Sequence, residues 1–417
     1  MIVLFILFLF LLVIFFRNKS LALILSAIQV ISFGGSFFLG RDIIIENLGD
    51  YGIVFMMIVI LSLIVISWKD YYGVKNIIVF DESKLKFLTK VLVILNSYSF
   101  VILFVIAIIV QSNVKDINEF KYQTGVSEKF ITANLPFPSV FFSIAIILSN
   151  FCFFLLPLHF YYLYRKKYLL SLVCLLLSTN SMLVGLTYFS RAVIIHFIFL
   201  YIGMLPLFYG MFDAKIKRTF KWFFTIAGAV FFVYFLDVSV RRFEEDSSSA
   251  KIYSKTIPVD AITQDPLTYS FIDYMSQGYI NGYEVLQLYD GEGFNGGLTF
   301  EKITSLVSSP YDTYLRKKYR EKLWPYHYSY SFNGFPAYVI YDYGIIGGLL
   351  FCLFYFMIVT KMKPKKGNLK LKNTFLITLL VQIPLLSIFY SEFPGLIISF
   401  ILWIPLIIYL NIKLRAL

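Results

Sequence analysis

Three arginines at the ends of apolar segments are the residues of this 417-residue chain whose type and placement best suit chemistry. Arg191 opens an apolar segment in YFSRAVIIHF, and Arg241 and Arg242 directly follow another. A guanidinium group stays charged and presents a planar fork that matches phosphate oxygens. We therefore expect these arginines to bind a diphosphate group. Two alternatives stay open: Arg191 as a snorkelling anchor, and the arginine pair as a complement to a helix dipole.

Three further residues could accept a proton. Asp342 lies several residues inside the apolar stretch YVIYDYGIIGG, and an ionisable group at that depth suggests function. Glu392 lies at the turn between the last two apolar segments, and His327 lies in a long polar loop. Each is a candidate base for deprotonating a hydroxyl group. The alternatives are a structural pairing of Asp342 with an arginine such as Arg191, and a loop histidine without function.

The long loop also carries aromatic and amide side chains that suit a sugar. Aromatic rings can stack on the apolar faces of sugars, and amides can bond their hydroxyl groups. Tyr279, Gln277, Asn281 and Asn333 are the candidates for such a groove. The alternative is an aromatic belt at the membrane surface.

Composition indicates that the elements holding these residues are membrane helices. Hydrophobic residues make up 59% of the chain and charged residues only 15%, which is typical of a membrane protein. Apolar stretches of about twenty residues recur throughout, each long enough to cross the hydrocarbon with its backbone hydrogen bonds satisfied as a helix. The predicted spans are residues 2–16, 20–38, 52–68, 87–111, 138–164, 168–188, 191–212, 220–240, 333–360, 373–390 and 393–412.

The charges between these spans predict a topology. Basic loops alternate with acidic or neutral ones across all eleven spans, and basic loops face the cytoplasm. We expect a multi-pass protein of the cell inner (cytoplasmic) membrane, with its N-terminus outside and its C-terminus in the cytoplasm. The expected organisation is a single integrated domain: helices 1 to 8 in residues 1–240, a large extracytoplasmic loop in 241–332, and helices 9 to 11 in 333–417.

Two helices are expected inside the large loop. Asp265-Pro266 is an N-cap and first-turn signal for a helix over residues 267–289. Residues 299–322 form a second helical stretch that ends in a basic cluster. A loop of this length is too long for a mere connection, so we expect it to carry function.

Several classes of protein are excluded by missing signatures. The sequence has no P-loop, no GxGxxG after a strand, no HExxH, no GxSxG and no zinc-like His and Cys cluster. We therefore expect neither a metal nor another cofactor. The net charge of +12 comes from short clusters between apolar segments, so a nucleic-acid partner is not expected.

With these motifs in place, the chain resembles the O-antigen polymerases, the Wzy type of oligosaccharide repeat-unit polymerase. The likeness covers the whole chain in architecture, with about a dozen spans and a dominant outer loop in the second half. Locally it rests on Ser190-Arg191, on Arg241-Arg242, on YMSQGYINGYEVLQ and on YVIYDYGIIGG. The paired arginine-to-glycine repeats of some members are not found in this sequence. The fold class that the resemblance implies is an all-α, polytopic, GT-C-like membrane protein.

The resemblance implies a glycosyltransferase of O-antigen (lipopolysaccharide) or capsular polysaccharide biosynthesis. Its partners would be undecaprenyl-diphosphate-linked oligosaccharides, membrane lipids and a regulator of chain length. Because arginines can neutralise a diphosphate leaving group without a metal, the missing metal motif agrees with this reading. The alternatives are a flippase or other transporter of lipid-linked oligosaccharides, an O-antigen ligase, and a structural or regulatory subunit. Charge concentrated at one face favours an enzyme over a flippase, whereas polymerase and ligase are not separated.

Overall fold

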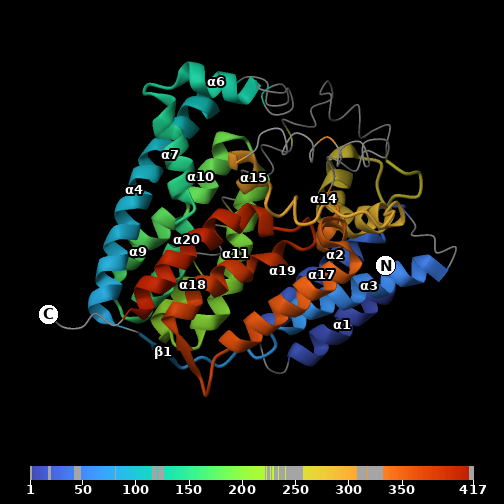
Figure 1. Ribbon diagram of the computed structural model, residues 1–417, viewed down its shortest axis with the longest axis horizontal. Coiled ribbons are helices and arrows are strands. Elements are labelled where there is room, and N and C mark those ends of the chain that lie inside the picture. The colour runs from blue at the N-terminus through green and yellow to red at the C-terminus, as the bar shows by residue number, and fades with distance from the viewer. Residues whose placement is uncertain are drawn as a thin grey trace. The chain divides into compact units, whose positions relative to one another are not determined.

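A computed structural model describes residues 2–16, 20–41, 48–79, 81–114, 120, 126–220, 222, 226, 228–229, 233, 240, 257–307, 317 and 332–412. The described chain is mostly helical (Figure 1) and divides into two compact units. The first unit comprises Met1–Gly73, Ile252–Pro364 and Leu380–Ile398. The second comprises Val74–Lys251, Lys365–Leu379 and Ser399–Leu417. The predicted span 220–240 and most of the loop beyond residue 307 lie largely outside the described residues.

Five described helical stretches are long and apolar enough to cross a membrane. They are Gly49–Ile66, Glu82–Asn113, Tyr168–Thr187, Gly334–Met362 and Phe393–Asn411. The helices Ser139–Ser149 and Cys152–Tyr164, which meet at 50°, make a sixth span if the pair is counted as one. These helices support the prediction of an α-helical membrane protein, and the count of eleven spans stays a prediction.

The first unit is a bundle built around a polar helix. Its helices are α1 (Ile2–Phe16), α2 (Leu21–Ser36), α3 (Leu48–Ile66), α14 (Pro266–Gln287), α15 (Glu301–Val307), α17 (Gly334–Met362) and α19 (Gln382–Leu386). In this bundle α14 packs against α2, α3 and α17 (Figure 1). The predicted start of α14 is confirmed, because the Asp265 carboxylate accepts a hydrogen bond from the Thr268 amide at 2.7 Å and Pro266 occupies the first turn.

Two glycines let the chain pass unusually close to α14. A Cβ atom added at Gly278 would lie 1.9 Å from the Ile388 carbonyl oxygen, and one at Gly282 would lie 2.3 Å from that of Asn333. The two facing segments are tied together, since the Gly334 amide donates to the Phe389 carbonyl at 2.9 Å. Only glycine at these positions permits this backbone-to-backbone contact.

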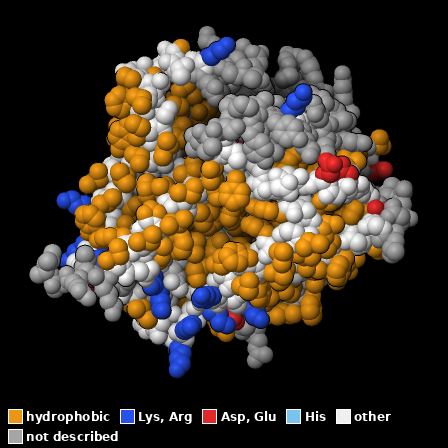
Figure 2. Space-filling view, viewed as in Figure 1, with side chains coloured by type: hydrophobic (Ala, Val, Ile, Leu, Met, Phe, Trp, Pro, Cys, Tyr) orange, Lys and Arg blue, Asp and Glu red, His pale blue; other side chains and the backbone are white. Residues whose placement is uncertain are grey.

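Helix α17 is interrupted where its environment changes. Gly344 has φ 73° and ψ 173°, values that break the helix and favour glycine. Residues before the break are mostly buried against α14. Residues after it expose large hydrophobic side chains, among them Ile346, Leu350 and Phe354. The second half of α17 is therefore the part whose surface suits lipid contact, and Figure 2 shows hydrophobic side chains over it.

The second unit is a helical bundle with a small β clip. Its helices are α4 (Glu82–Asn113), α6 (Val126–Asn134), α7 (Ser139–Ser149), α8 (Cys152–Tyr164), α9 (Tyr168–Ser178), α10 (Asn180–Thr187), α11 (Arg191–Tyr209), α18 (Leu371–Leu380) and the greater part of α20 (Phe393–Asn411). Strands β1 (Asn76–Ile78) and β2 (Asn368–Lys370) pair in parallel, with Ile77 opposite Leu369. Helix α4 contacts α7, α8, α9 and α10 and so forms the spine of this unit.

Buried amides and hydroxyls hold these helices together. The Asn180 side-chain amide donates to the Asn96 backbone carbonyl at 2.9 Å, and the Ser99 hydroxyl donates to the Ala145 carbonyl at 3.0 Å. Such bonds join helices that cannot rely on hydrophobic burial alone in a bilayer. The predicted continuous span 138–164 is instead bent at residue 150. There the Asn150 side-chain amide bonds the Ile146 carbonyl at 3.1 Å and so competes with the helix ladder.

Candidate functional site

The candidate site lies in the first unit and begins with a row of polar side chains along one face of α14. The Gln277 amide donates to the Asp273 carboxylate at 2.9 Å, and the Asn281 amide donates to the Gln277 side-chain oxygen at 3.0 Å. Asn281 also donates to the Phe332 carbonyl at 2.9 Å. The spacing of four residues puts all three on one side of the helix. This polar row therefore reaches from α14 to the chain segment that leads into α17.

Tyr279 points the other way, into the core of the first unit. Its ring is 1% exposed and stacks on Phe33 with 4.6 Å between the ring centroids. Its hydroxyl donates to the side-chain oxygen of Gln29 at 2.5 Å, and Gln29 in turn donates to the Ser387 hydroxyl at 3.0 Å. These contacts tie α14 to α2 and to the end of α19. In this structure the predicted sugar-stacking ring of Tyr279 is engaged inside the unit.

An aromatic cluster borders the polar row. Tyr274, Phe332 and Phe389 lie with ring centroids 5.0 to 5.4 Å apart, and Tyr390 lies 6.0 Å from Phe332. Each pair is tilted or edge-to-face, as aromatic contacts prefer. The cluster joins the polar row to residues 389–392, the segment that precedes α20.

Glu392 follows Tyr390 of this cluster by two residues and opens α20. Its backbone carbonyl accepts the first helical hydrogen bond, from Leu396 at 3.1 Å. Burial raises the pKa of the Glu392 carboxyl to about 7, while the Lys302 charge and a hydrogen bond from the Tyr390 hydroxyl act in the opposite direction. The Lys302 ammonium donates to the Gly395 carbonyl at 3.2 Å, which holds the lysine at the same turn. Glu392 is thus a partly buried carboxyl that can gain or lose a proton near neutral pH.

Asp342 binds a backbone turn. The fully buried carboxylate accepts hydrogen bonds from the Leu298 amide at 2.9 Å and the Thr299 amide at 2.8 Å, and also from the Thr299 hydroxyl. In addition, the Asp342 carbonyl accepts from the Gly296 amide at 3.0 Å. These bonds satisfy a buried charge. Asp342 therefore fixes the turn 295–300 on the first half of α17.

This turn leads directly into α15, which carries Lys302. The Asp342 carboxylate accepts a hydrogen bond from the amide of Thr299, three residues before Lys302. By holding the start of α15, Asp342 sets the position from which Lys302 reaches the first turn of α20. The two predicted carboxylates, Asp342 and Glu392, are linked in this way through residues 299–302.

An ion pair ties α14 to the segment that follows α2. The Arg41 guanidinium lies 2.9 Å from the Glu284 carboxylate, and both side chains are about a quarter exposed, at 26% and 27%. Nearby, the Gln287 amide donates to the Asp50 carboxylate at 3.1 Å. These contacts place further polar groups along α14, toward its C-terminal end.

Of the ten predicted site residues, six lie in the described part of the first unit. Gln277, Asn281, Asn333 and Glu392 come together in the first unit, with Asn333 buried beside Phe332 at the start of α17. Arg191 belongs to the second unit, where it begins α11, and its side chain lies outside the described part. Tyr279 and Asp342 are buried in the first unit, with the partners described above. Arg241, Arg242 and His327 lie outside the described residues.

Sequence reasoning missed Lys302, Tyr390 and the two contact glycines. The glycines had a usable signal, because Gly278 and Gly282 have the GxxxG spacing that lets another segment approach a helix closely. No local sequence signal pointed to Lys302, because it lies ninety positions before Glu392 in the sequence.

Within the described ranges no group of three or more His, Cys, Asp or Glu side chains could hold a metal ion. Comparison with protein-family models, curated proteins and solved structures finds no match to this chain. The structure supports the class of α-helical membrane proteins, with a titratable carboxyl beside a cluster of amide and aromatic side chains.

Proposed function

We propose that this chain is a glycosyltransferase that joins lipid-diphosphate-linked oligosaccharide repeat units, as an O-antigen polymerase does, at the outer face of the cytoplasmic membrane. The observation that carries the proposal is the position of Glu392. Its carboxyl accepts a hydrogen bond from the Tyr390 hydroxyl, and the Tyr390 ring lies 6.0 Å from that of Phe332. The Phe332 carbonyl in turn accepts a hydrogen bond from the Asn281 amide at 2.9 Å. A base beside groups able to hold a sugar is what glycosyl transfer without a metal requires.

In the proposed reaction an acceptor hydroxyl of one repeat unit attacks the anomeric carbon of the growing chain. The new glycosidic C–O bond forms as the C–O bond to the lipid diphosphate breaks, and the hydroxyl proton passes to the Glu392 carboxylate. The diphosphate leaves with both electrons of the broken bond. Lys302 and Tyr390 hold Glu392 in position and favour its ionised form. Asp342 acts as a positioning residue through the turn 295–300.

The diphosphate is assigned to Arg191, Arg241 and Arg242, whose guanidinium groups suit phosphate oxygens. The proposal keeps the eleven-span topology, with the N-terminus outside and the C-terminus in the cytoplasm, so that these arginines and Glu392 share the outer face. Among the described spans, α17 and α20 are each long and apolar enough to cross the bilayer.

Gel profiles of surface glycolipid from a deletion strain test the proposal. Complementation with the intact gene should restore a polymer ladder, and Glu392→Gln should leave single repeat units only. The matched control is Glu292→Gln, which alters an exposed carboxylate of the same unit and should restore the full ladder. Loss of even the single unit in the deletion strain would point to a flippase or ligase. A normal polymer ladder from Glu392→Gln would show that Glu392 is not the base of the reaction.

The arginine assignment has its own test. Alanine at both Arg191 and Arg241, with the protein level checked, should shorten or abolish the polymer because the leaving group loses its charge partners. A lysine at Arg191 keeps the charge and loses the fork, so an intermediate ladder is expected. Normal polymer from the double alanine variant would contradict the assignment of the diphosphate to these arginines.

A further inference from the structure

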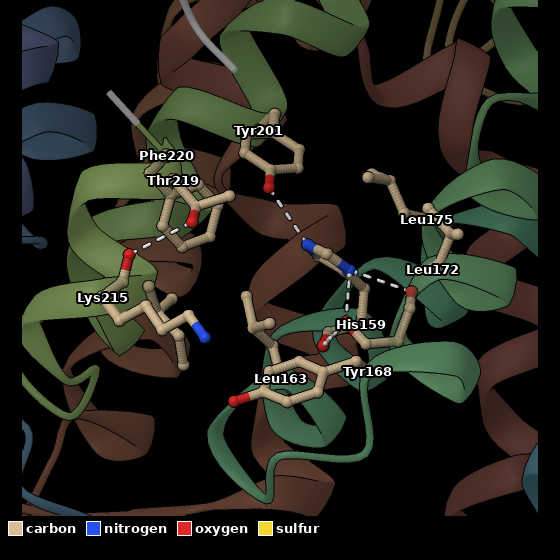
Figure 3. Close-up of a pocket in the computed structure, with 11 residues that line it drawn as sticks. His159, Leu163, Tyr168, Leu172, Leu175, Tyr201, Lys215, Thr219 and Phe220 are labelled. Carbon is tan, nitrogen blue, oxygen red and sulfur yellow. Dashed lines mark hydrogen bonds between the residues drawn. The ribbon is translucent and has the colours of Figure 1, made fainter. Parts of the chain in front are cut away.

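The second unit contains a cavity of about 450 Å³ that the proposed reaction does not use (Figure 3). Its walls come from α8, α9, α11 and the helical segment 214–220. The volume lies in the range of roughly 300–1,000 Å³ typical of small-molecule sites. Most of its lining is apolar, with Leu163, Leu172, Leu175, Ile216 and Phe220 as the aliphatic and phenyl members.

The buried floor of the cavity offers few polar groups to a ligand. Both ring nitrogens of His159 are engaged, one 3.0 Å from the Tyr201 hydroxyl and the other 2.9 Å from the Ser171 hydroxyl. These bonds close within the protein, as the dashed lines in Figure 3 show. A polar head group would therefore find little to bond at the floor, whereas a hydrocarbon chain would find apolar contacts.

The mouth of the cavity differs from the floor. Tyr168 and Leu172 are 53% and 60% exposed, so the cavity opens on the surface of α9, which belongs to an apolar stretch long enough to span a membrane. In Figure 3 the Lys215 ammonium points from segment 214–220 toward Leu163 and Tyr168. The mouth thus combines a lateral opening toward lipid with one positive charge.

The charge of Lys215 is not neutralised within the described part of the chain. The carboxylate nearest in sequence, Asp213, pairs with Lys166 at 3.7 Å. Lys215 itself forms no ion pair with any described carboxylate. The Thr219 hydroxyl donates to the Lys215 backbone carbonyl at 3.1 Å, a contact within the helix that does not involve the ammonium. An amphiphile with a negative head group would complement both parts of the cavity.

We propose that this cavity binds one anionic phospholipid, with an acyl chain between α8, α9 and segment 214–220 and the phosphate against Lys215. The acyl chain would then contact α8, α9 and segment 214–220 at once. The site is separate from Glu392, so binding is expected whether or not the protein transfers sugars.

Native mass spectrometry of the full chain in detergent provides the test, with palmitoyl-oleoyl phosphatidylglycerol and phosphatidylcholine as the two probes. The unaltered protein should retain one phosphatidylglycerol in preference to phosphatidylcholine. Lys215→Glu should lower that preference at least about fivefold, as expected when one basic group near an anionic lipid is lost. Lys217→Glu is the matched control, because the Lys217 ammonium lies 5.1 Å from the centroid of the Tyr209 ring and does not line the cavity.

A cavity-filling variant separates this site from lipid bound elsewhere. Leu175→Trp should abolish retention of both lipids, and Leu172→Trp at the exposed mouth replaces it if thermal unfolding shows that the first variant does not fold. Equal retention of the two lipids by the unaltered protein would overturn the head-group assignment. Unchanged retention by Lys215→Glu or by the folded tryptophan variant would overturn the site.

Discussion

Replacement of Lys302 by methionine should move the pH profile of the transfer reaction to higher pH. The Lys302 charge favours the ionised form of Glu392 and opposes the effect of burial, which raises the pKa of that carboxyl to about 7. Without the charge, burial is less compensated and the pKa rises further. Methionine keeps most of the aliphatic length of lysine, so packing against the first turn of α20 changes little.

The magnitude follows from the ionised fraction of a single carboxyl. With a pKa of about 7, that fraction rises from about one tenth at pH 6 to about nine tenths at pH 8, and the rate of a reaction that needs the carboxylate should rise with it. A rise in the pKa by about one unit, the low end for loss of a neighbouring opposite charge, would lower the rate at pH 7 to about a fifth. At pH 9 the variant and the unaltered protein should nearly coincide.

Initial rates of polymer formation by the purified protein, measured with lipid-linked repeat units between pH 5.5 and 9, provide the assay. Lys361→Met is the control, since Lys361 is an exposed lysine in the last turn of α17. The pH profile of this variant should match that of the unaltered protein. Superimposable profiles for Lys302→Met and the unaltered protein would refute the electrostatic reasoning. A rate that falls between pH 6 and pH 8 would assign Glu392 as an acid.

Three further predictions concern stability. The pKa of Glu392 in the folded chain, about 7, exceeds its ordinary value of 4.5. The contribution of this carboxyl to the free energy of unfolding is therefore full below pH 4.5 and is lost as the pH rises through 7. Glu392→Gln should flatten the fall in Tm between pH 5 and pH 8, because a contribution of at most about 3 kcal/mol no longer varies with pH. Gly278→Ala should destabilise the first unit by about 1–3 kcal/mol or more, measured by unfolding in detergent. Gly52→Ala, where an added Cβ would meet no atom within 4 Å, should be neutral or stabilising. Equal effects of the two substitutions would contradict the close contact at Gly278. Asp342→Asn should cost about 1.5–3 kcal/mol and speed hydrogen exchange in residues 294–300, and unchanged exchange there would show that the carboxylate does not hold the turn.

Much of the helical pattern could be predicted from local sequence signals. The span 2–16 coincides with α1, and Asp265-Pro266 marks the start of α14 because a capping carboxylate and a proline without an amide proton suit the first turn. The second loop helix, predicted from residue 299, begins at Glu301. These features depend on neighbours within one or two turns, which a single sequence contains.

Breaks within the spans could not be predicted from hydropathy. The predicted span 373–390 consists of α18 and α19, and the predicted span 333–360 is interrupted at Gly344. A hydropathy window records only that a segment is apolar, so a glycine with positive φ inside it leaves no trace. The same limit hid the role of Asp342, whose partners are backbone amides 43 and 44 residues earlier.

The close contact at Gly278 and Gly282 explains why the candidate site forms at this place. It brings the carbonyl groups of Ile388 and Asn333 onto α14, so the segments before α17 and α20 both start from the same helix. Residues 389–392 then emerge at a fixed point beside Phe332, and the Tyr390 and Glu392 side chains follow. A proton-accepting group must hold its position to within a fraction of an ångström to be effective, and backbone contacts fix position better than a loop does. The site is therefore built on two positions without side chains, and substitutions there should disturb Glu392 as much as changes to the groups it touches.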